Sequence, residues 1–66
     1  MTKLKMLRFE LDMQSKDLAE GLKVHPTSLS KVETRKIKAS DLMRYRLSKF
    51  YGLPESELFD DGRYAV

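Results

Sequence analysis

The sequence predicts an all-α protein built from five short helices. Apolar residues recur three or four positions apart along most of the chain, which is the spacing of one helix face. The chain has 66 residues and no cysteine, so we expect one thin core and a function on the surface, without disulfides or thiolate metal sites. The expected single domain covers residues 1–66, with helices at about 2–11, 15–22, 26–34, 40–51 and 54–59 and a loose tail at 60–66.

The first two helices follow from apolar stripes and a capping residue. Leu4, Leu7 and Leu11 lie on one face of the first helix, so we expect all three to point into the core. The second helix begins near Ser15, a residue type whose side-chain oxygen caps the free amides of a helix start. Its buried face is expected to consist of Leu18, Ala19 and Leu22.

The third helix is defined by a proline. Pro26 disfavours the α conformation at His25 and itself fits the first position of a new helix. Leu29 and Val32 should face inward. The opposite face then carries Thr27, Ser28, Lys31 and Thr34.

The last two helices are separated by a glycine and a proline. Ser40 can cap the fourth helix, Gly52 ends it, and Pro54 begins the short fifth helix. The residues expected to face inward are Met43, Leu47, Phe50 and Tyr51 in the fourth helix and Leu58 and Phe59 in the fifth.

Charge is distributed unevenly along the chain. The formal net charge is +3, but residues 31–49 hold seven cations against two acids, whereas residues 55–61 hold four acids and no cation. A basic middle suits phosphate groups, and the acidic end would face away from them. On charge alone, a lysine-rich face that only contacts water is the alternative.

The composition gives no support for catalysis. His25 is the only histidine, and neither Ser28 nor Ser30 has Asp and His partners at the spacing of a nucleophile. We therefore expect a protein that is not an enzyme and takes no cofactor, metal or small-molecule ligand. The charged N-terminus and the short apolar runs predict neither a secretion signal nor a membrane span, and hence a cytoplasmic protein.

Three stretches together resemble a known family. Leu18–Val24 is similar to a helix and turn, Leu29–Glu33 to the core of a recognition helix, and Gly52–Phe59 to the closing segment of the same domain. The family is the lambda-repressor-like helix-turn-helix domains of phage Cro proteins, phage repressors and xenobiotic-response-element regulators. The resemblance spans about residues 4–59 and implies a five-helix fold that binds double-stranded DNA.

The resemblance also implies roles for individual residues. Thr27, Ser28 and Lys31 would face base edges in the major groove, while Pro26 would contribute shape alone. The polar face of an ordinary surface helix is the alternative. Phosphate contacts are expected from Gln14 or Ser15, Lys23, Thr34, Arg35, Lys36 and Lys38.

Arg8 and Glu33 would match a family pair that ties the first helix to the end of the third, which makes them structural. Two glycine positions of the family hold Lys23 and Arg35, so one or both are expected in a left-handed conformation at a cost of about 1 kcal/mol. Arg44 stands where the family expects an apolar residue, which leaves the register of the fourth helix open by one.

The resemblance further implies a homodimer through the region from the fourth helix onward. The candidate contacts are Tyr45, Leu53, Phe59 and Tyr64, each of which could equally be an ordinary core residue. The expected function is a sequence-specific transcriptional repressor of the phage Cro type that occludes a promoter. The alternative is a protein-interaction module of the same fold, such as an antitoxin or antirepressor, whose basic face binds an acidic partner.

Overall fold

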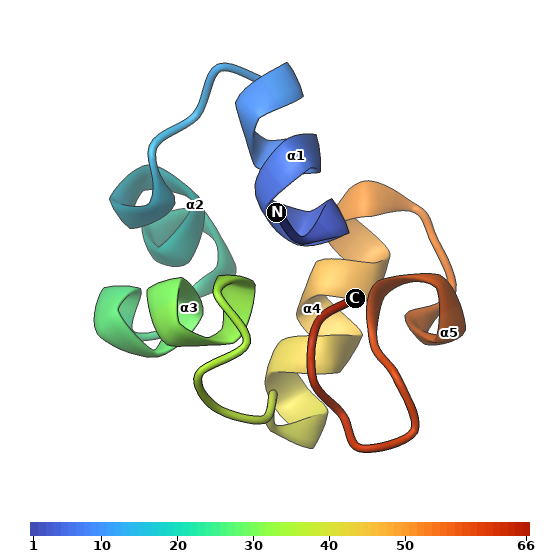
Figure 1. Cartoon of the computed structure of the whole chain (residues 1–66). Helices are drawn as coiled ribbons and strands as arrows, with labels where there is room; N and C mark the ends of the chain where they lie inside the picture. Colours follow the sequence, from blue (N-terminus) through green and yellow to red (C-terminus); the bar gives the residue numbers. More distant parts are fainter.

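The computed structural model describes residues 1–66 and contains five helices and no strand, as the sequence predicts. Each predicted helix end agrees with the structure to within one residue. The difference arises because end residues such as Thr2 and Ser40 cap their helices through the side chain instead of continuing them. In chain order the helices are α1 (Lys3–Glu10), α2 (Ser15–Leu22), α3 (Pro26–Glu33), α4 (Asp41–Tyr51) and α5 (Glu55–Leu58) (Figure 1).

The helices surround a small core. α2 and α3 lie on one side of the molecule and α5 on the other, with α4 between them (Figure 1). The core residues are Leu4, Leu18, Ala19, Leu29, Val32, Ala39, Met43, Leu47, Leu58, Phe59 and Ala65. No helix is both long enough and apolar enough to span a membrane.

Two residues expected in the core lie at the surface. Leu11 is 51% exposed because α1 ends at Glu10 and Leu11 extends beyond the part of the helix that covers the core. Phe50 is 44% exposed because the inward position after Leu47 is taken by Tyr51, four residues on. The ring of Phe50 packs edge-on against Tyr51, with 4.9 Å between ring centroids.

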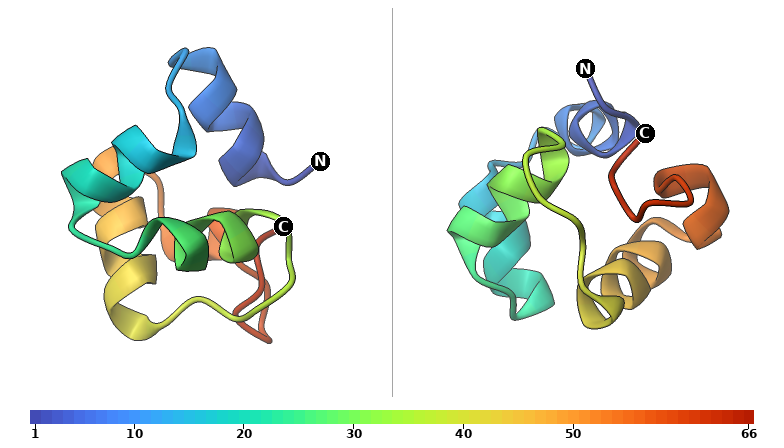
Figure 2. Two further views of the ribbon diagram at one scale, coloured as in Figure 1. Left: turned by 90° about the vertical axis from the view of Figure 1, so that its left-hand side faces the viewer. Right: turned by 60° about the horizontal axis from the view of Figure 1, so that its bottom comes forward.

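The expectation of a loose tail is wrong. The C-terminal segment, residues 60–66, turns back so that Ala65 pairs with Phe59 in an antiparallel bridge and is fully buried. The backbone N–H of Lys3 donates to the carbonyl of Val66 at 2.6 Å, which joins the two ends of the chain (Figure 2). Backbone hydrogen bonds and a small buried side chain hold this segment in place, so it forms part of the fold.

Candidate nucleic-acid interface

A three-residue turn sets the angle between α2 and α3. Lys23 adopts the left-handed conformation with φ of 58°, and the next amide, of Val24, donates to the carbonyl of Ala19 at 3.0 Å. Arg35, with φ of 64°, is also left-handed, so both positions that hold family glycines have the expected conformation. The turn packs α3 onto α2 through Leu29 while the opposite face of α3 stays exposed.

The start of α3 is fixed by its cap. The Nδ1 atom of His25 accepts a hydrogen bond from the backbone N–H of Thr27 at 3.2 Å, and Pro26 occupies the first turn. On the exposed face, Pro26, Thr27 and Lys31 are open to solvent. Ser28 is half-buried and lines a hollow of about 300 Å³ between the α2–α3 turn and the start of α4. The structure thus brings the four expected base-reading residues onto one helix.

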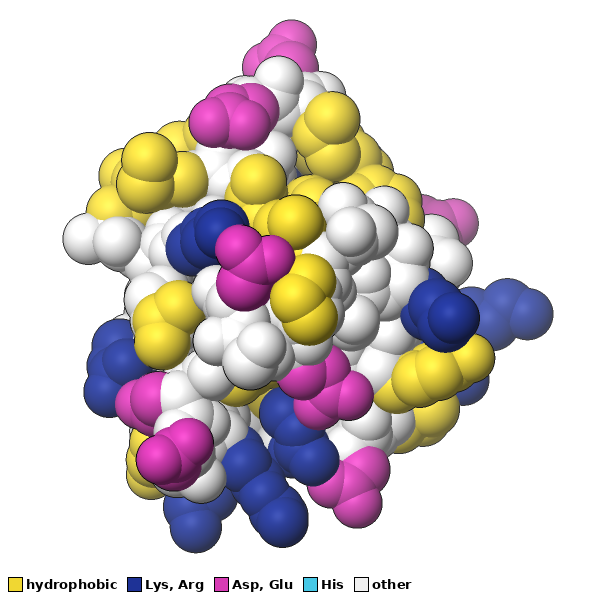
Figure 3. All heavy atoms as spheres, turned by 90° about the vertical axis from the view of Figure 1, so that its right-hand side faces the viewer, with side chains coloured by type: hydrophobic (Ala, Val, Ile, Leu, Met, Phe, Trp, Pro, Cys, Tyr) yellow, Lys and Arg dark blue, Asp and Glu magenta, His cyan; other side chains and the backbone are white.

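Cations without acidic partners surround this helix. The ion pairs of the chain join Lys3 to Glu57, Arg8 to Glu33, Arg35 to Asp60, Arg44 to Asp41 and Glu55, and Arg63 to Asp41. Lys23, Lys31, Lys36 and Lys38 are exposed and belong to none of these pairs. On the α5 side, by contrast, cationic and acidic side chains are interleaved (Figure 3). Four exposed cations around α3 therefore have no acidic partner.

Arg35 differs from the neighbouring lysines because the same chain binds its guanidinium. Nη1 donates to the carbonyl of Ala65 and Nη2 to Oδ2 of Asp60 at 3.2 Å. The backbone N–H of Tyr64, and next the guanidinium of Arg35, hold the pKa of Asp60 below its usual value. Sequence reasoning missed this role because it assigned no structure to the C-terminal segment. Thr34 is also partly engaged, since its hydroxyl donates to the carbonyl of Ser30 at 3.0 Å.

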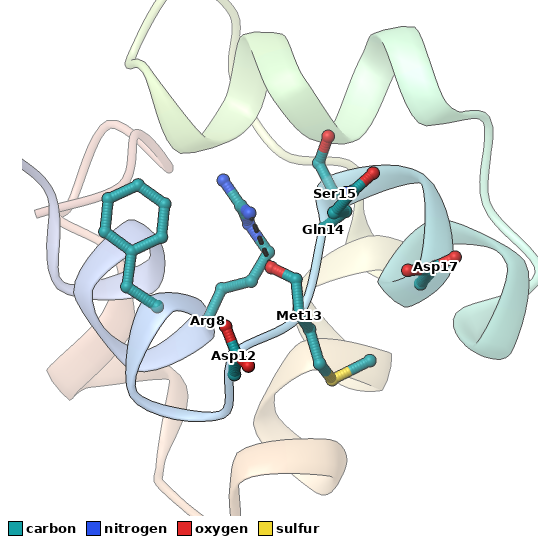
Figure 4. A pocket seen from close by; sticks show the side chains of 7 residues that line it. Arg8, Asp12, Met13, Gln14, Ser15 and Asp17 are labelled. Carbon is teal, nitrogen blue, oxygen red and sulfur yellow. Dashed lines mark hydrogen bonds between the residues drawn. The ribbon is translucent and has the colours of Figure 1, made fainter.

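A hollow of about 680 Å³ separates the end of α1 from the start of α2. Gln14 is the N-cap of α2 in place of the expected Ser15, which is already helical, and Gln14 makes no side-chain hydrogen bond. Gln14 and Ser15 lie on the side of the hollow nearest α3 (Figure 4). Their polar groups are therefore open to an outside partner. Asp12 and Asp17 also line the hollow, so part of its wall is acidic.

Arg8, which lines this hollow, forms a buried ion pair that ties α1 to α3. Nε of Arg8 donates to both carboxylate oxygens of Glu33, at 3.1 and 3.0 Å. Nη1 of Arg8 donates to the carbonyl of Met13 at 2.8 Å (Figure 4). Arg8 is 8% exposed and Glu33 2%. Burial, and then the negative charge of Glu33, raises the pKa of nearby Tyr51 to about 12. One cation thus holds the end of α3 and the loop that enters α2.

Not all of the residues expected to form a dimer contact are exposed. Phe59 is only 5% exposed because it packs in the core of its own chain, so this candidate is corrected. Leu53 and Tyr64 are half-buried, and Tyr45 is 56% exposed. Sequence reasoning missed the exposed Leu42, although its position three residues before Tyr45 places both on one face of α4.

The exposed face of α3, set by a tight turn on α2 and flanked by unpaired cations, defines a helix-turn-helix protein of the DNA-binding class. A family model described as helix-turn-helix matches residues 4–58, and the chain belongs to this family, the lambda-repressor-like helix-turn-helix proteins. It is a regulatory family and not an enzymatic one, so the chain is, in general terms, a DNA-binding regulator of transcription. No curated protein and no solved structure matches the chain.

Proposed function

We propose that this chain is a sequence-specific repressor of the phage Cro type, which inserts α3 into the major groove and occludes a promoter. The observation that carries the proposal is the set of four exposed lysines around α3 that have no acidic partner. Unpaired cations at this site gain by releasing counterions from DNA without first breaking an internal ion pair.

Within the groove, short and long side chains have different roles. Thr27 and Ser28 present hydroxyls near the start of α3. Because these side chains are short, they reach base edges only when the helix lies deep in the groove. Lys31 lies one turn further along and reaches deeper, toward guanine O6 and N7. Pro26 has no free amide and contributes shape.

Phosphate contacts come from the surroundings of α3. Lys23 precedes the helix and Lys36 and Lys38 follow it, so the three lysines grip the backbone at both ends of the helix. Gln14 and Ser15 at the start of α2 and Thr34 at the end of α3 add hydrogen bonds. Arg35 contributes only when it shares its guanidinium between the C-terminal segment and a phosphate.

The repressor is proposed to act as a homodimer on a two-fold site, because a single short helix reads only a few base pairs. Tyr45, Leu53 and Tyr64 are the candidate contacts that stay accessible. A dimer bound at the site sterically excludes polymerase.

A gel shift on random double-stranded DNA at low salt, repeated at increasing salt, tests DNA binding directly. We expect affinity to fall linearly on a logarithmic plot, and selection from a random pool should then give one preferred sequence. Lys3, which pairs with Glu57 on the α5 side, provides a control, since Lys3→Ala removes one cation away from the site. Absence of binding at low salt would contradict the proposal and favour the protein-interaction alternative.

A further inference from the structure

The loop after α3, residues 34–40, is bonded to the C-terminal segment near both of its ends. Near its start, the guanidinium of Arg35 donates to the carbonyl of Ala65. Near its end, the backbone N–H of Ala39 donates to the carbonyl of Arg63 at 3.0 Å. The loop and the C-terminal segment therefore lie side by side (Figure 2).

The C-terminal segment is itself fixed to the core and to α5. Ala65 is fully buried and pairs with Phe59. The backbone N–H of Val66 donates to the carbonyl of Leu58 at 3.1 Å. The loop is thus bonded to a support that the core holds in place.

The middle of the loop depends on this support. The backbone N–H groups of Ile37 and Lys38 donate to no other group of the chain. Lys36, by contrast, is bonded to α3, because its N–H donates to the carbonyl of Lys31 at 2.8 Å. Lys38 is exposed, belongs to no ion pair and directly precedes Ala39. Lys38 is therefore placed mainly by the bond that Ala39 makes to the C-terminal segment.

One carboxylate supports both bonded points. Oδ2 of Asp60 accepts from Nη2 of Arg35 at 3.2 Å. Oδ1 of Asp60 accepts from the backbone N–H of Tyr64 at 3.0 Å, and the carbonyl of Asp60 accepts from the N–H of Arg63 at 2.9 Å. These last two bonds close the turn that presents the carbonyl of Arg63 to Ala39. Asp60 thus fixes the start of the loop with one carboxylate oxygen and its end with the other.

The charge of Asp60 opposes a role in DNA binding. A carboxylate near a phosphate site repels DNA, and its pairing with Arg35 also keeps that cation from a phosphate. Asp60 does not pair with Lys36 or Lys38, so the loop retains two free cations. Positioning and repulsion therefore predict opposite signs for the loss of this carboxylate.

We infer that Asp60 is a positioning residue of the proposed DNA site, which holds the loop after α3 so that Lys38 meets a phosphate. The inference rests on the proposed function and gives the C-terminal segment a part in it. A lysine whose backbone is already ordered loses less conformational freedom on binding, so the held loop binds DNA more tightly.

Substitution of Asp60 and of its exposed neighbour Asp61 separates positioning from repulsion. Asp60→Asn and Asp61→Asn each remove one negative charge from the C-terminal segment, but only Asp60 bonds to Arg35. Fluorescence anisotropy on random duplex DNA at low salt should show Asp60→Asn binding about two- to tenfold more weakly than Asp61→Asn, at a temperature where circular dichroism shows both folded. Binding by Asp60→Asn that is as tight as that of Asp61→Asn, or tighter, would overturn the inference.

A double-mutant cycle locates the effect. Lys38→Ala should cost less affinity in the Asp60→Asn background than in the wild type, because the lysine is then no longer held. Lys23→Ala, which lies outside the loop, should cost the same in both backgrounds. An equal cost of Lys38→Ala in both backgrounds would show a general effect of stability or charge and would contradict positioning.

A measurement without DNA keeps the inference distinct from the proposed function. Nitrogen-15 relaxation should give order parameters of about 0.85 for the amides of Ile37 and Lys38 in the wild type and below about 0.6 in Asp60→Asn. Arg35→Lys keeps the net charge but replaces the forked guanidinium that bonds to Ala65 and Asp60, so this second variant should loosen the loop in the same way. Unchanged order parameters in both variants would refute the inference. Absence of DNA binding by a wild type whose loop is ordered would overturn the proposed function instead.

Discussion

At the scale of single residues, the pair of Arg8 and Glu33 shows why a buried charge fixes a geometry. Each charge is desolvated, and each is tolerated because the other lies within 3.0 Å. The third donor contact, from Arg8 to the carbonyl of Met13, extends the constraint to the loop before α2. The side chain of Arg8 therefore joins α1, the α1–α2 loop and the end of α3.

Glu33→Ala should lower the free energy of unfolding by about 3–5 kcal/mol, because it leaves the guanidinium of Arg8 buried and unpaired. Urea denaturation followed by circular dichroism measures the change. Glu20→Ala removes an exposed carboxylate from α2 and serves as the control, with an expected effect within about 0.5 kcal/mol. An unchanged denaturation midpoint for Glu33→Ala would contradict the role of the pair.

Substitutions of Lys31 and Lys36 should change DNA binding in different ways. Lys31→Ala should cost about 1–3 kcal/mol on the preferred sequence and much less on random DNA, because the side chain reaches base edges. Lys36→Ala should weaken all sequences alike and reduce the slope of log K against log salt by about 0.9, the loss of one phosphate contact. Fluorescence anisotropy on both DNAs at several salt concentrations separates the two effects. Equal weakening of specific and random DNA by Lys31→Ala would contradict its assignment.

Lys23 and Arg35, two of the four non-glycine residues with positive φ, give opposite predictions for glycine. Lys23→Gly should raise the free energy of unfolding by up to about 1 kcal/mol, because it relieves a strained conformation and breaks no hydrogen bond of the side chain. Arg35→Gly relieves similar strain but loses the bonds to Ala65 and Asp60, so we expect no gain in stability. Thermal denaturation of both variants measures the change in stability. Stabilisation of equal size by the two substitutions would show that the contacts of Arg35 do not stabilise the fold.

At the scale of elements, hydrogen bonds of Arg35 join the loop after α3 to the C-terminal segment. We call this contact the latch. Asp60 accepts hydrogen bonds from Arg35 and from the backbone of Tyr64, which lowers its pKa in the folded protein. A group with a lowered folded pKa stabilises the fold above its unfolded pKa, and this contribution is lost as the pH falls through the folded pKa.

Asp60→Asn should therefore be less stable than the wild type at neutral pH, and the difference should shrink as the pH falls below about 4, the unfolded pKa of an aspartate. Urea denaturation at several pH values measures both curves. Asp61→Asn, on an exposed neighbour, provides the control. A constant difference between wild type and Asp60→Asn down to acidic pH would contradict the latch.

The helices could be predicted from the sequence because their signals are local. Capping residues, a proline at the start of α3 and apolar spacing all act within a few residues. The sequence of the C-terminal segment has no such capping residue and no helical spacing of apolar residues. Ala65 is buried through pairing with Phe59 and contact with distant core residues, and this burial depends on tertiary structure that no short window contains. The same limit explains why the sequence left Phe59 open between a core position and a dimer contact.

The site was predictable to the same extent. The face of α3 follows from helical periodicity, so Thr27 and Lys31 are exposed as expected. Which cations stay unpaired does not follow, because ion pairs such as Arg35 with Asp60 join residues far apart in the chain. Sequence reasoning therefore grouped Arg35 with Lys36, whereas the structure separates them.

At the scale of the whole molecule, the ion pairs of the C-terminal acidic residues and the unpaired lysines around α3 lie on different parts of the surface. Acidic residues near the C-terminus neutralise cations from α1, α4 and the loop after α3 through ion pairs on their side. The lysines around α3 lack such partners, so a chain with a net charge of only +3 presents a strongly basic face. In the proposed function, these lysines orient the molecule with α3 toward DNA before any specific contact forms.

This orientation, together with the proposed homodimer, predicts the form of the binding site. A two-fold dimer presents two copies of α3 to the same face of DNA, and both fit successive major grooves only when they lie about 34 Å apart, one helical turn. The selected sequence should therefore be a near-palindrome. Hydroxyl-radical footprinting should show two protected half-sites that fill together, and Tyr45→Glu should bind each half-site separately and more weakly. Protection of a single, asymmetric half-site at every protein concentration would show that the chain acts as a monomer, because a two-fold dimer cannot leave one half of its site free.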